Sequence, residues 1–235
     1  MKKLFVSAIL SYMLGCVHLA HYFGKKVKNV DIRTTGSHNS GTANAIMVVG
    51  WRYGLMTLVF DVFKGFFAVY AARRFLTGAL PVYVNAFSVI MGHIFPVTMK
   101  FHGGKGVATL VGSSLGISTV LFACLLAVLV CVSFLTNYLA IGDAGAACTF
   151  ASYTYYIHGL SVMFWLACIV MAVMIARHME NYRRIAAGGA GEVPIDFFIK
   201  QRGIKPDDLE DIDDFKNYKI KKKIPADVNE VLPKS

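Results

Sequence analysis

Six long apolar runs, separated by short polar loops, make up most of the first 176 residues of this chain. Most of them approach the ~20 residues that a helix needs to cross the hydrocarbon core of a bilayer. Of the 235 residues, 56% are hydrophobic and 16% are charged, whereas a soluble domain is roughly 45–50% apolar. The sequence therefore predicts an all-α polytopic membrane protein. The runs cover residues 4–23, 53–72, 82–97, 107–135, 139–156 and 160–176.

The whole chain has a net charge of +10, and the positive charge is concentrated in its membrane part. Residues 1–199 contain 15 Lys and Arg against 6 Asp and Glu, while residues 200–235 contain 9 against 8. This excess favours contact with anionic lipid headgroups or with phosphorylated substrates. Because the pattern offers no soluble basic face, we expect no nucleic-acid partner.

The five cysteines all lie within apolar runs, without a CxxC spacing or a nearby pair of histidines. Cysteines in such positions pack as small apolar side chains. We therefore expect no disulfide framework, no metal site and no cofactor.

The cations that flank the first run predict its orientation. Four Lys and Arg lie between residues 25 and 33, whereas only Lys2 and Lys3 precede the run. The positive-inside rule therefore places loop 24–43 in the cytoplasm and the N-terminus outside. The second run then leads outward and the third returns, so residues 103–106 are also expected on the cytoplasmic side.

The number of crossings follows from the end of the last run, where Arg177, Arg183 and Arg184 predict a cytoplasmic C-terminal part. An even number of crossings must then lie between residues 107 and 176. Splitting run 107–135 into two short helices, with a bend within 119–124, gives seven transmembrane helices. A five-helix arrangement remains if two runs merge or one is re-entrant. The division is thus a transmembrane domain, 1–192, and a short charged cytoplasmic tail, 193–235.

The stretch "GHIFPVTMKFHGGKGVAT", residues 92–109, interrupts the apolar pattern with a lysine between glycines. Gly103, Gly104 and Gly106 around Lys105 combine a bare backbone with a cation, which suits the close approach of an anion. The stretch is not a P-loop, because the first glycine and the Ser or Thr after the lysine are missing. The alternative is a lysine whose amine reaches the membrane interface.

The stretch "TTGSHNSGTAN", residues 34–44, places small and amide residues before a helix start. Its backbone N–H groups, with Ser37, Asn39 and Asn44, are candidates for a phosphate cradle. An ordinary turn with a helix cap explains the pattern equally well.

Two further groups of polar residues lie on single helix faces. Arg177, His178, Asn181 and Arg184 fall on a stripe about 120° wide after the last run; the alternative is a cationic cap on a spanning helix. Asp61 and Lys64 lie three residues apart within the second run, where an unpaired charge is costly, so we expect them to pair structurally.

These stretches together resemble the bacterial acyl-phosphate-dependent glycerol-3-phosphate acyltransferases, the PlsY type. Residues 92–109 match that family's second motif almost throughout. "GSHNSGTAN" is similar to its first motif, "DVFKG" to a helix segment of the family, and "RHMENYRRIAAGGAGE" to its closing segment. The resemblance covers residues 1 to about 192.

The resemblance implies a seven-helix enzyme of the bacterial cell membrane with a cytoplasmic-facing active site. It implies transfer of a fatty acyl group from acyl phosphate to the 1-hydroxyl of glycerol 3-phosphate, which gives lysophosphatidic acid for phospholipid biosynthesis. Phosphate is a good leaving group, so orientation and charge neutralisation suffice. We expect direct attack without an acyl-enzyme, by a monomer in contact with membrane lipids.

The resemblance also implies roles for residues. Lys105 would stabilise the leaving group, and His178 with Asn181 would bind the glycerol phosphate or its attacking hydroxyl, so these three are the predicted catalytic residues. Which phosphate each group binds stays open. The predicted phosphate-binding residues are Ser37, Asn39, Gly41, Asn44, Gly103, Gly104, Gly106 and Arg184, and the supporting residues are Asp61, Lys64, His93 and Glu192.

The chain departs from the family at three places. Met47 stands where an arginine is expected, and Arg52 lies about 140° further around a continuous helix. Ala140 and Gly142 stand about where the third motif has serines, and His38 replaces a usual glycine. A lost charge-assisted phosphate contact costs roughly 1.5–3 kcal/mol. The alternative function is therefore a non-catalytic or altered-specificity lipid-phosphate binder or transporter on the same scaffold.

Overall fold

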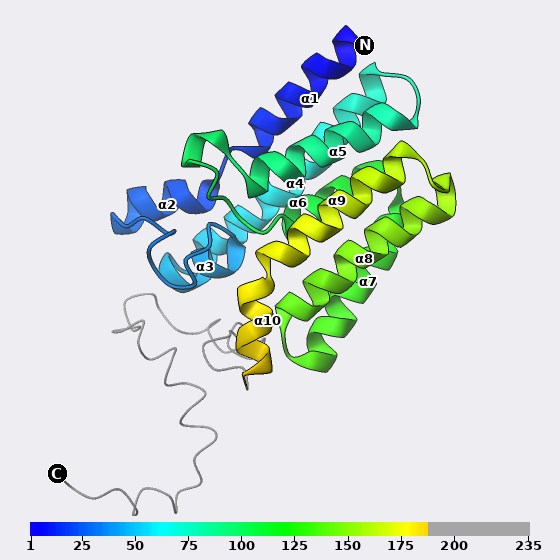
Figure 1. Ribbon diagram of the computed structural model, residues 1–235. Coiled ribbons are helices and arrows are strands. Elements are labelled where there is room, and N and C mark those ends of the chain that lie inside the picture. The colour runs from blue at the N-terminus through cyan, green and yellow to red at the C-terminus, as the bar shows by residue number, and fades with distance from the viewer. Residues whose placement is uncertain (188–235) are drawn as a thin grey trace, which may run out of the picture.

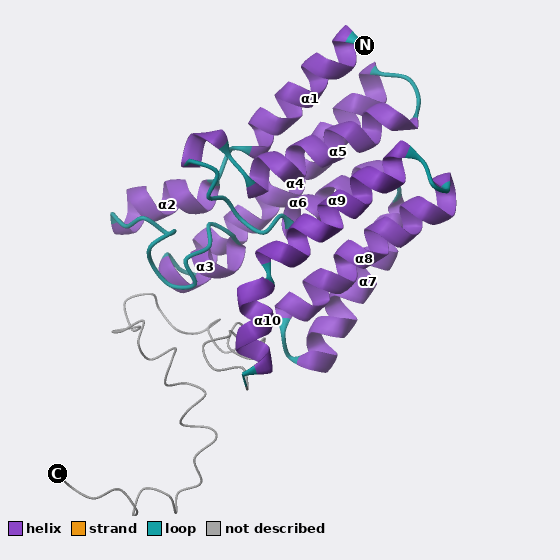
Figure 2. Ribbon diagram, in the orientation of Figure 1, coloured by secondary structure: helices purple, strands orange, loops and turns teal. Residues whose placement is uncertain are grey.

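The computed structural model describes residues 1–187, and within this part the regular structure is entirely helical (Figures 1 and 2). Predictions for Glu192 and for the tail 193–235 lie outside the described residues. The longer helices are α1 (Lys2–Gly15), α4 (Trp51–Phe75), α5 (Ala79–Ile94), α6 (Val107–Ile117), α7 (Thr119–Thr136), α8 (Leu139–His158) and α9 (Val162–Arg177). The shorter elements are α2 (Leu19–Lys28), α3 (Thr42–Val48), the 3-10 turn η1 (Val97–Met99) and α10 (Met179–Ala186).

The longer helices lie roughly side by side, in an order that runs across Figure 1 from α1 through α5, α4 with α6, and α9 to α8 with α7. The most extensive helix contacts are those of α4 with α6, α7 with α8, and α1 with α5. The short helices α2, α3 and α10 all lie at the end of the bundle opposite the N-terminus, α2 beside α3 and α10 beside α8 and α9. We call this end, with residues 95–106, the loop end.

Glycine allows close approach in two of the helix pairs, α4 with α6 and α1 with α5. A Cβ added at Gly112 of α6 would lie 1.8 Å from the Val62 carbonyl oxygen of α4, and one at Gly65 of α4 would lie 2.2 Å from the Thr109 oxygen. A Cβ at Gly92 of α5 would similarly lie 2.1 Å from the Tyr12 oxygen of α1. Small residues permit such backbone approach in membrane helices, where lipid removes the hydrophobic drive for association.

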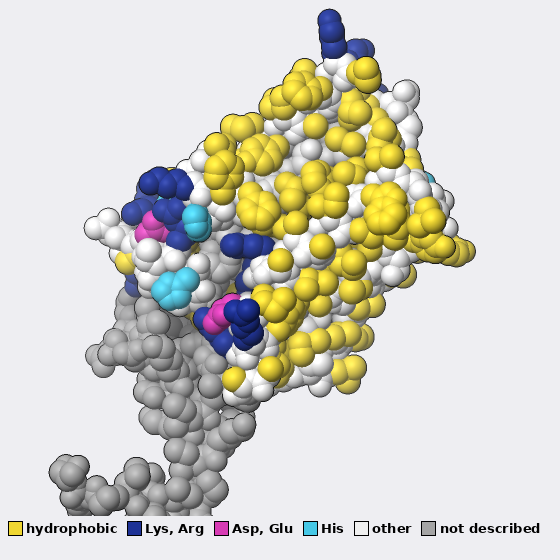
Figure 3. Space-filling view, viewed as in Figure 1, with side chains coloured by type: hydrophobic (Ala, Val, Ile, Leu, Met, Phe, Trp, Pro, Cys, Tyr) yellow, Lys and Arg dark blue, Asp and Glu magenta, His cyan; other side chains and the backbone are white. Residues whose placement is uncertain are grey.

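The outer surface of the bundle is apolar, as the broad hydrophobic area in Figure 3 shows. Large side chains such as Phe63, Phe67 and Trp165 are exposed there. Among the described residues, four helical stretches are long and apolar enough to cross a membrane, and a fifth qualifies if α9 and α10, bent by 50°, count as one. The prediction of an all-helical membrane protein with several spanning helices is thus confirmed. The four stretches are Lys2–Lys28, Trp51–Phe75, Ala79–Met99 and Thr119–Thr136.

The predicted division of run 107–135 is confirmed, although the break lies at Ser118, one residue before the expected range. Ser118 has extended backbone (φ −162°, ψ 133°), and its Oγ accepts a hydrogen bond from the Leu121 amide at 3.4 Å. The Tyr153 hydroxyl of α8 donates to the same oxygen at 3.0 Å. The break is therefore stabilised by a helix cap and by the neighbouring helix.

Two other helix breaks differ from the predicted continuous segments. The first apolar run is divided into α1 and α2, and the backbone carbonyls at this break are bound by a lysine from α4. The segment after Asn44 is divided into α3 and α4 at Gly50. The φ of Gly50 is 112°, a backbone conformation that favours glycine. Arg52 therefore lies on α4 and not on the helix that carries Met47, so the predicted 140° relation between them is wrong.

Candidate active site

The loop end gathers three stretches that are far apart in sequence. Residues 29–41 connect α2 to α3, residues 95–106 connect α5 to α6, and α10 follows α9. Figure 3 shows basic and histidine side chains clustered at this end, beside the apolar surface of the bundle. The predicted first, second and closing motifs therefore meet at one end of the molecule.

Lys105 joins the second motif to the closing motif. Its Nζ donates to the Oδ1 atom of Asn181 at 2.5 Å. Nearby, Arg177 Nη2 donates to the Gly103 carbonyl oxygen at 3.2 Å. Lys105 is only partly buried. These contacts bring together two of the three predicted catalytic residues, Lys105 and Asn181.

The glycines around Lys105 pack against the end of α5. The Gly104 amide donates to the His93 carbonyl oxygen at 3.1 Å, and the Gly103 amide donates to that of Ile94 at 3.2 Å. A Cβ at Gly104 would lie 2.1 Å from His93 Nε2, and Gly106 has φ +90°. The predicted open cradle is therefore incomplete, because the amides of Gly103 and Gly104 are already hydrogen-bonded.

A buried polar cluster holds His93 in place. Lys64 is fully buried, and its Nζ lies 2.8 Å from Asp61 Oδ1 and 2.8 Å from His93 Nδ1. The same amine donates to the carbonyl oxygens of Gly15, at 3.2 Å, and Val17, at 2.9 Å, at the break between α1 and α2. The predicted Asp61–Lys64 pair is confirmed. It supports both the break between α1 and α2 and, through His93, residues 103–106, which we call the glycine loop.

Asn44 shapes the loop of the first motif. This side chain is fully buried; its Oδ1 accepts from the Ser37 amide at 2.8 Å, and its Nδ2 donates to the oxygens of Ile32 and Thr35, at 2.7 and 3.0 Å. The Asn44 side chain is thus engaged with backbone, whereas Ser37, Asn39 and Gly41 are partly exposed. His38, the predicted departure from glycine, has φ +58°.

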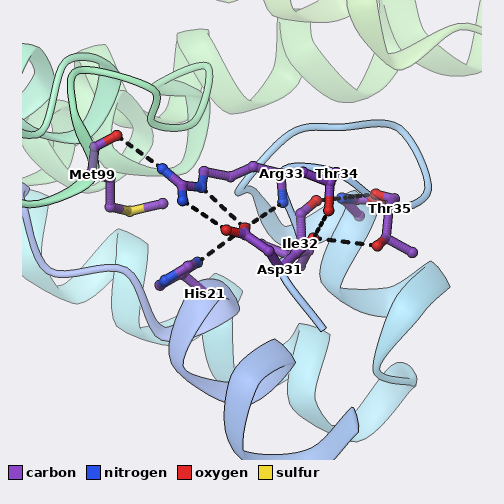
Figure 4. Close-up of polar contacts among 8 residues, drawn as sticks. His21, Asp31, Ile32, Arg33, Thr34, Thr35 and Met99 are labelled. Carbon is purple, nitrogen blue, oxygen red and sulfur yellow. Dashed lines mark hydrogen bonds and ion pairs between the residues drawn. The ribbon is translucent and has the colours of Figure 1, made fainter. Parts of the chain in front are cut away.

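An ion-pair network at Asp31 ties this loop to the second motif (Figure 4). Arg33 donates to both carboxylate oxygens of Asp31, through Nε at 3.0 Å and Nη2 at 2.7 Å, and its Nη1 donates to the Met99 oxygen at 3.0 Å. His21 of α2 lies 3.5 Å from Asp31 Oδ1. Hydrogen bonds from Arg33 hold the pKa of Asp31 well below its usual range. This network was not predicted from the sequence, although the D-x-R spacing of Asp31 and Arg33 was a usable signal.

His178 joins the closing motif to the third motif. The ring is 1% exposed; Nδ1 lies 2.7 Å from the Met174 carbonyl oxygen, and Nε2 lies 2.9 Å from Asp143 Oδ2. The Tyr182 hydroxyl also donates to the Ala140 oxygen, at 3.3 Å. Both ring nitrogens are engaged, so a substrate contact through the ring would require one bond to break. Asp143, which lies on α8, was missed.

Two further contacts concern Arg184 and Ser114. Arg184 Nε lies 3.2 Å from Glu180 Oε1 on the exposed side of α10. Residues 112–116 have a G-x-S-x-G spacing, but Ser114 is fully buried within α6 and its Oγ donates to the Val111 oxygen at 2.7 Å. This serine is not an exposed nucleophile on a strand-to-helix turn.

Comparison with known proteins gives concordant matches. A family model described as glycerol-3-phosphate acyltransferase matches residues 5–188. A glycerol-3-phosphate acyltransferase 1 from Oceanobacillus iheyensis is 35% identical over 188 residues, covering 77% of this chain and 90% of the relative. A glycerol-3-phosphate acyltransferase from Coxiella burnetii is 33% identical over 190 residues, covering 81% of this chain and 98% of the relative.

Two solved structures are also similar to this chain. The crystal structure of PlsY, an integral membrane glycerol 3-phosphate acyltransferase, in its glycerol 3-phosphate form has a TM-score of 0.75 at 26% identity, covering 84% of this chain and 98% of that one. The lysophosphatidic acid form has a TM-score of 0.71 at 26% identity, covering 82% of this chain and 95% of that one.

Proposed function

Because this chain belongs to the glycerol-3-phosphate acyltransferase family, we propose that it makes lysophosphatidic acid by taking its acyl group from an acyl phosphate. The protein is a membrane acyltransferase of phospholipid synthesis, and the donor and the order of bond changes are the proposed steps. The observation that carries the proposal is the contact between Lys105 and Asn181. It places a cation from the glycine loop against the closing motif, at the polar end of an apolar bundle.

In the proposed reaction, the 1-hydroxyl oxygen of glycerol 3-phosphate attacks the carbonyl carbon of the acyl phosphate. An ester C–O bond forms, the C–O bond to phosphate breaks, and the hydroxyl proton leaves with the released phosphate. Negative charge grows on the departing phosphate, and Lys105 is positioned to stabilise it. No covalent enzyme intermediate is needed, and the burial of Ser114 is consistent with this direct route.

Phosphate binding is proposed to use the partly exposed residues of the first motif, Ser37, Asn39 and Gly41, together with Lys105 and Gly106. The amides of Gly103 and Gly104 instead fix the loop on α5. Asn44 contributes by holding the Ser37 amide in place. Arg184 remains a proposed source of positive charge near the site.

The proposed topology has seven crossings, formed by the seven longer helices of residues 1–187, with domain 1–192 responsible for catalysis. The clustering of cations at the loop end supports a cytoplasmic location for this end. The N-terminus then lies outside. A bacterial cell membrane, and a monomer surrounded by lipid, complete the proposal.

The donor can be tested with the purified full chain in lipid mesophase. Lysophosphatidic acid is expected from palmitoyl phosphate with glycerol 3-phosphate, but not from palmitoyl-CoA with the same acceptor. After rapid denaturation during turnover, mass spectrometry is expected to find no palmitoylated protein. Product formed only from palmitoyl-CoA would reject the donor, and an acyl-protein that forms and decays at the turnover rate would reject direct attack.

A further inference from the structure

The contacts of His178 define its protonation state together with that of Asp143. A backbone carbonyl oxygen can only accept a hydrogen bond, so Nδ1, 2.7 Å from the Met174 oxygen, must carry a proton. Nε2 lies 2.9 Å from Asp143 Oδ2, and a second proton must lie between these two atoms. The pair is therefore either a carboxylate with an imidazolium, or a carboxylic acid with a neutral imidazole.

The shared proton belongs on the histidine. An imidazole is a stronger base than a carboxylate, so the imidazole takes the proton that the two groups share. The Asp143 side chain is 15% exposed and so retains some access to water, whereas the His178 side chain is 1% exposed. A buried imidazolium requires a close anion, and Asp143 supplies it. The charged pair is overall neutral.

This pair lies beside the proposed phosphate site. His178 and Asn181 are three residues apart around the start of α10, so they share a helix face, and Asn181 accepts from Lys105. The Tyr182 ring stacks on the imidazole at a centroid distance of 6.0 Å. Arg177 precedes His178 in sequence, and its guanidinium donates to the Gly103 oxygen. Asp143 is the acidic residue that directly contacts the ring.

We propose that His178 in this chain neutralises and positions Asp143, and that it is neither the base that deprotonates the acceptor nor a direct phosphate ligand. Asp143 contacts His178, which lies one helical turn from Asn181, so an unpaired carboxylate at Asp143 would repel both phosphorylated substrates. The imidazolium cancels this charge, and its bond to Met174 fixes the pair at the junction of α9 and α10. Asp143 and His178 are therefore positioning residues, and this role rests on the proposed acyltransfer.

A double-mutant cycle tests the proposal through the KM for glycerol 3-phosphate. His178→Gln keeps a hydrogen-bond donor but leaves Asp143 without a cation, so KM is expected to rise about tenfold or more. Adding Asp143→Asn removes the uncompensated charge, so the double variant is expected to recover most of this increase. Thermal midpoints of all variants show whether each one is folded.

If His178 were a catalytic base or a phosphate ligand, adding Asp143→Asn would not restore the KM for glycerol 3-phosphate, because removing a carboxylate cannot replace a missing base or ligand. No recovery in a folded double variant would therefore overturn the proposal. A second measurement does not depend on turnover: nitrogen-15 spectra of histidine-labelled protein under the conditions of the activity assay, with the His178 signal assigned by its loss in His178→Gln. Both ring nitrogens of His178 are expected to be protonated, because the Met174 carbonyl oxygen and the Asp143 carboxylate both accept hydrogen bonds from the ring.

A neutral His178 in wild-type protein would overturn the charged pair even if acyl transfer is normal. Conversely, an imidazolium in a folded protein that transfers no acyl group would support the pair and reject the proposed function. The two failures are thus distinguishable in the same preparations.

Discussion

Replacement of Lys105 by alanine is expected to lower kcat for acyl transfer by about 10²–10³-fold, the usual effect of removing one group aimed at developing transition-state charge. The amine of Lys105 comes from the glycine loop and is hydrogen-bonded to Asn181 of α10. In the proposed reaction it stabilises the negative charge that grows on the departing phosphate. The measurement is the initial rate of lysophosphatidic acid formation with both substrates saturating.

The matched control is Lys100→Asn, which removes a cation five residues earlier in the same connecting segment. Lys100 is exposed and has φ 54°, and asparagine tolerates this left-handed conformation better than most residues. This variant is expected to retain a kcat within about threefold of wild type, since an exposed charge is screened by solvent and salt. Equal losses in the two variants would show that Lys105 acts only through the general positive charge of the loop end.

Replacement of Lys64 by methionine is expected to lower the free energy of unfolding by about 3–5 kcal/mol, the usual cost of breaking a buried ion pair. Methionine fills a similar volume but leaves the carboxylate of Asp61 buried without a cation. It also removes the donors to Gly15 and Val17, at the break between α1 and α2. The measurement is the unfolding midpoint and slope in denaturant, for full-length protein in detergent.

A double variant, Asp61→Leu with Lys64→Met, separates the two causes of this loss. Removing both charges eliminates the unpaired carboxylate, so the double variant is expected to be more stable than Lys64→Met alone. Recovery is expected to be partial, because the two helix-break carbonyls and His93 Nδ1 still lack their donor. A double variant no more stable than Lys64→Met would indicate that the carbonyl contacts, and not the ion pair, dominate.

Two features of the fold could be predicted from the sequence because a single physical requirement determined each of them. Parity of crossings required a break in run 107–135, and the structure has it at Ser118. Burial of two charges three residues apart required Asp61 and Lys64 to pair, and they do. The gathering of Lys105 and Asn181 followed from the family resemblance, because nothing in the spacing of the two residues predicts that they meet.

The sequence was less informative where a polar side chain had two uses. Asn44 resembles a phosphate ligand in the motif, but its amide satisfies carbonyls and an amide of its own loop. The glycines at 103 and 104 resemble a bare anion cradle, but they allow close packing on His93 and Ile94. Both uses favour the same residue types, so only the contacts distinguish them.

Asp143 was missed because its partner is distant in sequence. His178 follows it by 35 residues, and the contact depends on how α8, α9 and α10 meet. The altered third motif marked this region as unusual, but the prediction considered only the missing serines there and not Asp143. The loss of the family arginine at Met47 remains a departure for which the described contacts show no replacement cation.

The most direct test of the proposed function is to quantify phosphate and lysophosphatidic acid in the same samples of purified wild-type protein given palmitoyl phosphate. With glycerol 3-phosphate present, we predict one phosphate released for each lysophosphatidic acid formed. Without this acceptor, we predict neither product above the rate of spontaneous hydrolysis. A folded protein that binds palmitoyl phosphate but forms no lysophosphatidic acid would contradict the account, and would instead support a lipid-phosphate binder on the acyltransferase scaffold.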